Sequence, residues 1–302
     1  MYDRNDPRAA LASSKPAAPP PSRFAAPEYG RFYQDKPQDD GAGGRNWYIR
    51  GQNFVLAYSE ATKGARFERT EQVDEYVLIL PDDGTTATVT AGGASKDVTG
   101  PCVVMVPPGP GGIVSTSGGR LVRLVTSRAA DLVAKCPNAA SYAEQRPNIP
   151  PFEAWPVPPD GYKIRAYSLD VPKEPGRFGR IFRCTTFMVN YLDPQMGPRD
   201  ITKLSPHHHD DFEQCSLAVE GAFMHHLRWP WTVDMTAWRE DEHQHFATPS
   251  ALVIPPPCIH TTRGLEPGLN QLVDIFSPPR IDFSKQNGWV LNAADYPMPA
   301  EG

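Results

Sequence analysis

The stretch "SPHHHDDFEQCSLAVEG", residues 205–221, joins three consecutive histidines to an apolar run that ends at a glycine. Alternate side chains of an extended chain point to the same side, so His207 and His209 are expected to face one way and His208 the other. The next strand is predicted to have one mostly apolar face that begins with a carboxylate: Glu213, Cys215, Leu217 and Val219. We expect this face to line the interior of a β-barrel, where a bound cation would offset the cost of burying a carboxylate.

All eight histidines of the chain lie between residues 207 and 260, which indicates a local use for imidazole in the second half. His260 follows the stiff segment "VIPPPC", so it is expected at a turn or at the start of a strand. The predicted metal site is therefore a set of three histidines and one carboxylate: His207, His209, Glu213 and His260. Such ligands suit Fe(II), Mn(II), Ni(II), Cu(II) or Zn(II), and they leave positions open for water, oxygen or substrate.

The rest of the chain has the texture of a β protein. Short runs rich in β-branched residues, such as "WYIRGQNFVLAYSEA" and "GPCVVMVPPG", alternate with turns, and the 302 residues include 34 prolines and 24 glycines. We expect an all-β sandwich or barrel, with a short helix or two within residues 129–145. The predicted organisation is a Pro-rich flexible arm, a first barrel, a Pro-rich linker, a second barrel and a tail packed through Trp289 and Tyr296, over residues 1–45, 46–145, 146–160, 161–285 and 286–302.

The two β regions can be aligned with each other. Glu75, an apolar run and Gly84 in the first region correspond to Glu213, an apolar run and Gly221 in the second. Further along, "CVVMVPPGPGG" corresponds to "ALVIPPPCIH", which places Gly112 opposite His260. We therefore expect two copies of one β unit, of which only the second has histidines.

The spacing of His207, His209, Glu213 and Gly221, followed by a Pro-rich turn and His260, resembles the two motifs of the cupin superfamily. This resemblance covers about residues 46–285 and implies a bicupin: tandem double-stranded β-helix (jelly-roll) barrels with few short helices and an extended N-terminal arm. The second motif departs from the family pattern, because Cys258 and Ile259 stand where a glycine is usual. The same comparison implies that the first barrel has lost its ligands, since Gly112 replaces the histidine and "RFERTE" replaces the paired histidines.

Composition excludes several classes of protein. The net charge of −5 and the lack of a Lys/Arg block argue against nucleic acid as a partner. No signal-peptide core and no 18-residue apolar run are present, so we expect no membrane association and a cytoplasmic protein. Five scattered cysteines without a CxxC pair disfavour a disulfide framework. Family resemblance implies a homodimer.

Three functions remain open for a metal in such a barrel. The first is a mononuclear dioxygenase, with Fe(II) as the favoured ion, acting on a small diketone, phenolic compound or hydroxy-acid. The second is an isomerase or lyase in which the ion acts as a Lewis acid on a sugar acid or a similar carbonyl compound. The third is a protein that binds a small ligand without turnover, or a structural zinc site that uses Cys215 and Cys258.

Residues near the predicted ligands are candidates for further roles. His225 has the strand parity of Phe223 and Leu227 and is the candidate catalytic base. Four side chains are candidates for substrate binding: Arg228 and Arg263 for a carboxylate, and Tyr191 and Gln271 as hydrogen-bond partners. Trp229 and Trp231 are candidates for an aromatic wall. The remaining histidines are expected at the surface, and "EDEHQHF" at 240–246 is expected to be a charged hairpin tip and a weaker candidate for a second metal site.

Overall fold

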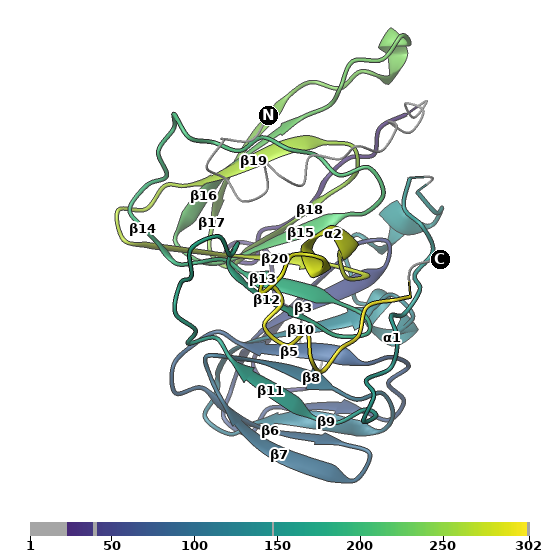
Figure 1. Cartoon of the computed structure of the whole chain (residues 1–302), viewed down its shortest axis with the longest axis vertical. Helices are drawn as coiled ribbons and strands as arrows, with labels where there is room; N and C mark the ends of the chain where they lie inside the picture. The colour runs from purple at the N-terminus through teal and green to yellow at the C-terminus, as the bar shows by residue number, and fades with distance from the viewer. Residues whose placement is uncertain (1–22, 39–40, 147, 301–302) are drawn as a thin grey trace.

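The computed structural model describes residues 23–38, 41–146 and 148–300, so residues 1–22 of the predicted arm lie outside the described part. The described chain is nearly all β, with two one-turn α-helices, α1 (Ala130–Val133) and α2 (Ile281–Ser284). Two β-barrels lie one above the other, the N-terminal one below in Figure 1 and the C-terminal one above. None of the helices in the described ranges is long and apolar enough to cross a membrane.

The first barrel consists of a large and a small antiparallel sheet. The large sheet has the order β11-β8-β5-β10-β3-β2 and the small sheet the order β4-β9-β6-β7. Their strands are β2 (Arg45–Arg50), β3 (Phe54–Ala61), β4 (Arg66–Arg69), β5 (Tyr76–Leu80), β6 (Thr86–Ala91), β7 (Ala94–Thr99), β8 (Cys102–Val106), β9 (Gly111–Ser115), β10 (Gly119–Thr126) and β11 (Arg165–Ser168). The expected short helices of residues 129–145 are present as α1 and the 3-10 helix η2 (Ala139–Tyr142).

The second barrel repeats this plan. Its large sheet has the order β1-β18-β15-β20-β13-β12, with β14 also pairing with β20, and its small sheet has the order β17-β16-β19. The strands are β1 (Glu28–Gly30), β12 (Arg180–Arg183), β13 (Met188–Tyr191), β14 (Gln195–Met196), β15 (Gln214–Glu220), β16 (Ala222–Arg228), β17 (Glu242–Ala247), β18 (Ser250–Ile254), β19 (Ile259–Gly264) and β20 (Leu269–Phe276). A 3-10 helix, η3 (Met235–Ala237), lies between β16 and β17.

The strand orders agree with the predicted duplication. In each large sheet the central strand, β5 or β15, lies between equivalent neighbours, β8 and β10 or β18 and β20. The outermost strands are exchanged: β1 precedes the first barrel in sequence but pairs with β18 of the second. β11 lies inside the predicted second-barrel range 161–285 but pairs with β8 of the first barrel. Each barrel therefore contributes one strand to the other, which fixes the barrels together.

The largest hydrophobic core lies between the two large sheets, where side chains of β3, β5 and β10 pack against side chains of β13, β15 and β20. The interiors of the two barrels differ. The first barrel is filled by apolar side chains, among them Leu78, Val89 and Ile113. The second barrel buries polar side chains in its interior, including Gln214, Ser216 and Asp274. The first barrel also buries Arg123, which stacks on Phe67 and donates to Ser59. In the second barrel, by contrast, Gln214 and Asp274 lie in the wall of a cavity in which a ligand or an ion could bind.

The prediction of a flexible arm over residues 1–45 is wrong for its described part. Phe24 and Phe32 are buried, and β1 pairs with Ala251, Leu252 and Val253 of β18. Apolar burial and strand pairing together hold this segment in place, because β18 would otherwise expose an edge. At the other end of the chain, Trp289 and Tyr296 are buried as the sequence predicts.

Candidate metal centre in the second barrel

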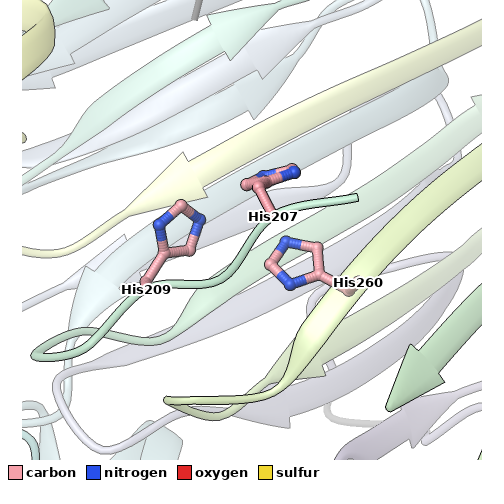
Figure 2. Close-up of side chains that lie close together, drawn as sticks. All are labelled: His207, His209 and His260. Atoms are coloured by element: carbon pink, nitrogen blue, oxygen red, sulfur yellow. The ribbon is translucent and has the colours of Figure 1, made fainter. Parts of the chain in front are cut away.

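Three histidines from two separated segments converge inside the second barrel. The backbones of His207 and His260 form an isolated β-bridge, with N–O distances of 3.0 and 2.7 Å. This bridge brings their ring centroids to 4.3 Å, and the ring of His209 lies 5.1 Å from His207 and 5.3 Å from His260. Figure 2 shows the three imidazoles pointing toward one another. One ring nitrogen of each lies within 4.8 Å of the others, and no other group of three potential ligands occurs in the described residues.

Hydrogen bonds determine which ring nitrogen faces the centre. Nδ1 of His207 lies 2.9 Å from the carbonyl oxygen of Ser205, and Nδ1 of His260 lies 2.9 Å from that of Cys258. A carbonyl oxygen only accepts, so both Nδ1 atoms carry the proton and both Nε2 atoms present a lone pair. Burial, with Arg280 and the other two histidines nearby, holds the pKa of His209 well below its usual range. All three rings are thus suited to bind a cation in their neutral form.

The predicted ligand Glu213 does not join the histidines. Its Oε1 accepts hydrogen bonds from Tyr142 at 2.9 Å and Arg146 at 2.8 Å, and its Oε2 accepts one from the backbone N–H of Gln52 at 2.6 Å. Arg146 also pairs with Glu28 of β1 at 3.2 Å. The carboxylate of Glu213 therefore lies at the junction between the barrels, and its assignment as a metal ligand is wrong in this structure.

The error has a physical cause in the direction of β15. Its apolar side chains, Cys215, Leu217 and Val219, pack in the core between the barrels, and Glu213 shares their face. Gln214 and Ser216 have the opposite parity and face the barrel interior. In a two-barrel protein the apolar face of a strand can pack on the other barrel, which leaves the polar face for the cavity.

Gln214 takes the place beside the histidines that the sequence analysis gave to Glu213. Its Oε1 accepts a hydrogen bond from Nε2 of His209 at 3.0 Å. Its amide nitrogen donates to Oγ of Ser216 and to Oδ1 of Asp274, each at 3.0 Å, and Ser216 also donates to Asp274. Because the amide nitrogen faces the Asp274 carboxylate, the carboxamide oxygen is directed toward His209.

A cavity of about 760 Å³ opens onto this cluster. His207, His260, Gln214 and Asp274 lie in its wall. Its other lining residues combine apolar side chains with charged groups, among them Leu192, Phe223, Leu272, Arg177, Arg199 and Lys203. Arg199 donates to the carbonyl of Thr262 at 2.8 Å and to Oγ of Ser205 at 3.2 Å, and so supports the segment that carries His207.

The candidate base His225 lies inside the barrel but does not line this cavity. Its Nδ1 is 2.8 Å from Oγ1 of Thr262, and its ring packs edge-on against Phe246 at 5.2 Å. Burial, with a smaller effect of His260, lowers the pKa of His225 to about 3. The structure therefore holds His225 as a neutral, packed side chain away from the space for a substrate.

The four candidate substrate-binding residues also lie away from the cavity. Arg228 is exposed and pairs with Asp241, and Arg263 lies on the outer face of the small sheet near His226. Tyr191 is buried in the core between the barrels, and Gln271 donates to the carbonyls of Leu192 and Leu272. Position in the sequence does not separate these places from the cavity, because each strand of the barrel has a solvent, core or cavity face according to its neighbours.

The remaining candidates are also placed elsewhere. Trp229 is buried under β18 and Trp231 is 79% exposed, so neither forms a wall of the cavity. Cys215 faces the core between the barrels and Cys258 packs with Trp229, so in the described ranges no cysteine joins the three histidines. This arrangement disfavours the structural-zinc alternative. Residues that the sequence analysis missed are Gln214, Asp274, Arg199 and Ser205.

No family model and no curated protein matches the sequence. Solved structures do match the fold. An oxalate decarboxylase from Lactobacillus farciminis, in complex with formate, aligns with a TM-score of 0.54 and 13% identity, over 87% of this chain and 88% of that chain. AerE from Microcystis aeruginosa aligns with a TM-score of 0.54 and 10% identity, over 81% of this chain and 97% of that chain.

These likenesses and the strand orders define the class of fold: two tandem double-stranded β-helix barrels of the cupin type. The chain is thus an all-β protein with cupin architecture, and three inward-facing histidines lie in its second barrel. At 10–13% identity the likeness is one of fold alone.

Proposed function

We propose that the chain is a metal-dependent enzyme whose ion is bound in the second barrel by His207, His209, His260 and Gln214. The convergence of three buried imidazoles at the end of a cavity is the observation that carries this proposal. The first barrel, with its mainly apolar interior, would act as a metal-free partner that supports the second.

The donor set fits a divalent transition metal. Nε2 of His209 donates to Oε1 of Gln214 at 3.0 Å in this structure. An ion would replace that proton at almost the same separation, since two ligands at right angles and about 2.1 Å from one ion are about 3.0 Å apart. Imidazole and carboxamide oxygen suit Fe(II), Mn(II), Ni(II), Cu(II) and Zn(II). Fe(II) remains our first choice because the favoured reaction needs a redox-active ion.

We propose a dioxygenase acting on a small oxygenated molecule, such as a diketone, a phenolic compound or a hydroxy-acid. A redox-active ion would supply the oxygen chemistry. The chain would bind and orient the substrate: Phe223 and Leu272 offer apolar contact, and Ser205 and Arg199 lie on the polar side of the cavity. His225 lies away from the cavity, which favours a dioxygenase over an isomerase or lyase that would use His225 as the base beside the substrate.

An isomerase or lyase is the second candidate, and one observation favours it. The carboxylate of Asp274 lies in the cavity wall. It accepts one hydrogen bond from the proposed ligand Gln214 and one from Ser216. In that reading Asp274 replaces His225 as the base that moves a proton on a carbonyl substrate. A non-catalytic binding protein would use the same cavity without turnover.

The test uses tag-free protein, because the chain itself has three consecutive histidines. Elemental analysis would identify the ion, and oxygen uptake would be measured with β-diketones, phenols and hydroxy-acids, with and without the His260→Ala substitution. The proposal predicts one ion per chain, and substrate-dependent oxygen uptake that His260→Ala abolishes and His208→Asn retains. Turnover of a sugar acid that is independent of oxygen, and lost in Asp274→Asn, would instead establish the isomerase or lyase. Tight binding without a product would establish the binding protein.

The homodimer stays a prediction, which light scattering of the same sample tests.

A further inference from the structure

The outer face of the small sheet of the second barrel carries a second group of histidines. On β16, Phe223, His225 and Leu227 are buried, whereas His226 has the opposite parity and is only partly buried. On β17, His243 and His245 are exposed. The antiparallel register places His226 directly opposite His243, and Met224 opposite His245. These side chains lie on the side of the sheet away from the cavity, so they do not contribute to the proposed active site.

His226 and His243 have a geometry that suits a shared ion. Their Nδ1 atoms lie 2.8 Å apart and their ring centroids 4.9 Å apart. Two nitrogens at right angles and about 2.0 Å from one ion are about 2.8 Å apart, whereas tetrahedral ligands would be about 3.3 Å apart. In this structure the two nitrogens share a hydrogen bond, and an ion in the right-angle arrangement that Ni(II) and Cu(II) accept would replace its proton with little change in their separation.

We propose that His226 and His243 form a second, surface metal site that binds Ni(II) or Cu(II) across the β16–β17 strand pair. His245, two residues further along the same exposed face, is the nearest third imidazole in sequence. The nearby charged groups are Arg263, which lies near His226, and Asp241, which lies near His243 and pairs with Arg228. The ion would connect two neighbouring strands, which the register already holds side by side, so binding needs no rearrangement of the backbone.

Ni(II) titration of tag-free protein by calorimetry tests this site. In addition to the inner ion, we expect one equivalent of Ni(II) to bind wild type, and we expect His226→Ala and His243→Ala each to weaken this equivalent by at least about tenfold. His208→Asn is the matched control, because it removes an exposed histidine outside the β16–β17 pair and should leave the titration unchanged. Cu(II) bound at the same site should show coupling to two nitrogens in its electron paramagnetic resonance spectrum.

The inner and outer sites are separable by substitution. His260→Ala should remove the inner ion and retain the outer equivalent, so a failed inner site would leave this inference intact. If His226→Ala and His243→Ala bind the same amount of Ni(II) as wild type with the same affinity, the outer pair binds no ion and the inference is wrong. Thermal melting of each variant without added metal identifies any loss of affinity that arises from unfolding.

Discussion

Gln214 and Glu213 are neighbours in sequence, yet their side chains have opposite surroundings. Gln214 faces His209 in the barrel interior, whereas Glu213 pairs with Arg146 at the junction between the barrels. At this scale the proposed site has a neutral donor set, with three imidazoles and a carboxamide. A bound divalent ion would therefore keep most of its charge for an oxygen-rich substrate.

Gln214→Ala is expected to weaken metal binding by about 10–100-fold without unfolding the protein. The substitution removes the proposed fourth ligand and the hydrogen bonds to Ser216 and Asp274, but it leaves the three histidines in place. Competition with a chelator measures the affinity, and the melting temperature shows whether the barrel is intact. Unchanged affinity would show that the carboxamide is not a ligand.

Glu213→Ala is expected to lower the stability of the protein without weakening metal binding. Removal of this carboxylate leaves the largely buried Arg146 with Glu28 alone and should lower the free energy of unfolding by about 1.5–3 kcal/mol. A Cβ at Gly51 would lie 2.7 Å from Oε2 of Glu213, so the approach of the two barrels depends on this glycine. Urea denaturation measures the loss of stability. Since Glu213 is not a ligand here, folded Glu213→Ala should retain its metal, and loss of the ion from folded protein would restore the original assignment.

The sequence led us to expect His207, His209 and His260 close together, as the structure has them, but it placed Glu213 beside them where the structure has Gln214. The spacing of His207, His209 and His260 determines their convergence, whereas the face of β15 depends on a second barrel that spacing does not describe. One signal was present: Glu75 aligns with Glu213, although its barrel has no histidine. Glu75 proves to be buried as well, bonded to Thr185 and Tyr296 across the junction. Because the glutamate recurs at the aligned position of a barrel that has no histidines, its role is indicated to be structural.

At the scale of elements, the short strands at the barrel edges were the least predictable. β1 has three residues and β11 has four, and each pairs with a strand that is distant in sequence. Local propensity carries little information about such pairs. The long apolar runs that form β5, β8, β15 and β18 were expected as strands, because their composition alone is typical of buried β structure.

His225 gives β16 a pH-dependent contribution to stability. The folded state keeps its imidazole neutral down to about pH 3, whereas the unfolded chain takes up a proton near pH 6.5. Between these values the unfolded state binds more protons, so the free energy of unfolding falls by about 1.4 kcal/mol per pH unit as the pH decreases. This contribution is fully present above pH 6.5.

Urea denaturation at pH 7.5 and pH 5.0 tests this effect. From pH 7.5 to pH 5.0, wild type should lose about 2 kcal/mol more unfolding free energy than His225→Gln. Equal pH dependence of the two proteins would show that His225 titrates normally in the folded state.

At the scale of the whole molecule, the duplication explains why the barrels differ. The bridge between His207 and His260 has its counterpart in the pairing of Glu68 with Gly112 on β4 and β9. The first barrel fills its interior mainly with apolar side chains around the buried Arg123, and the second keeps a polar cavity. The sequence predicted the two β units, and the lack of metal ligands in the first stays a prediction. It did not predict the exchanged outer strands, which come from outside the aligned segments.

The most direct measurement is an anomalous difference map from crystals of the tag-free protein, collected at the absorption edge of the ion that elemental analysis identifies. The account predicts a peak inside the second barrel, bonded to ring nitrogens of His207, His209 and His260 and to Oε1 of Gln214. A map without a peak among these residues, or with an ion there that His260 does not contact, would contradict it.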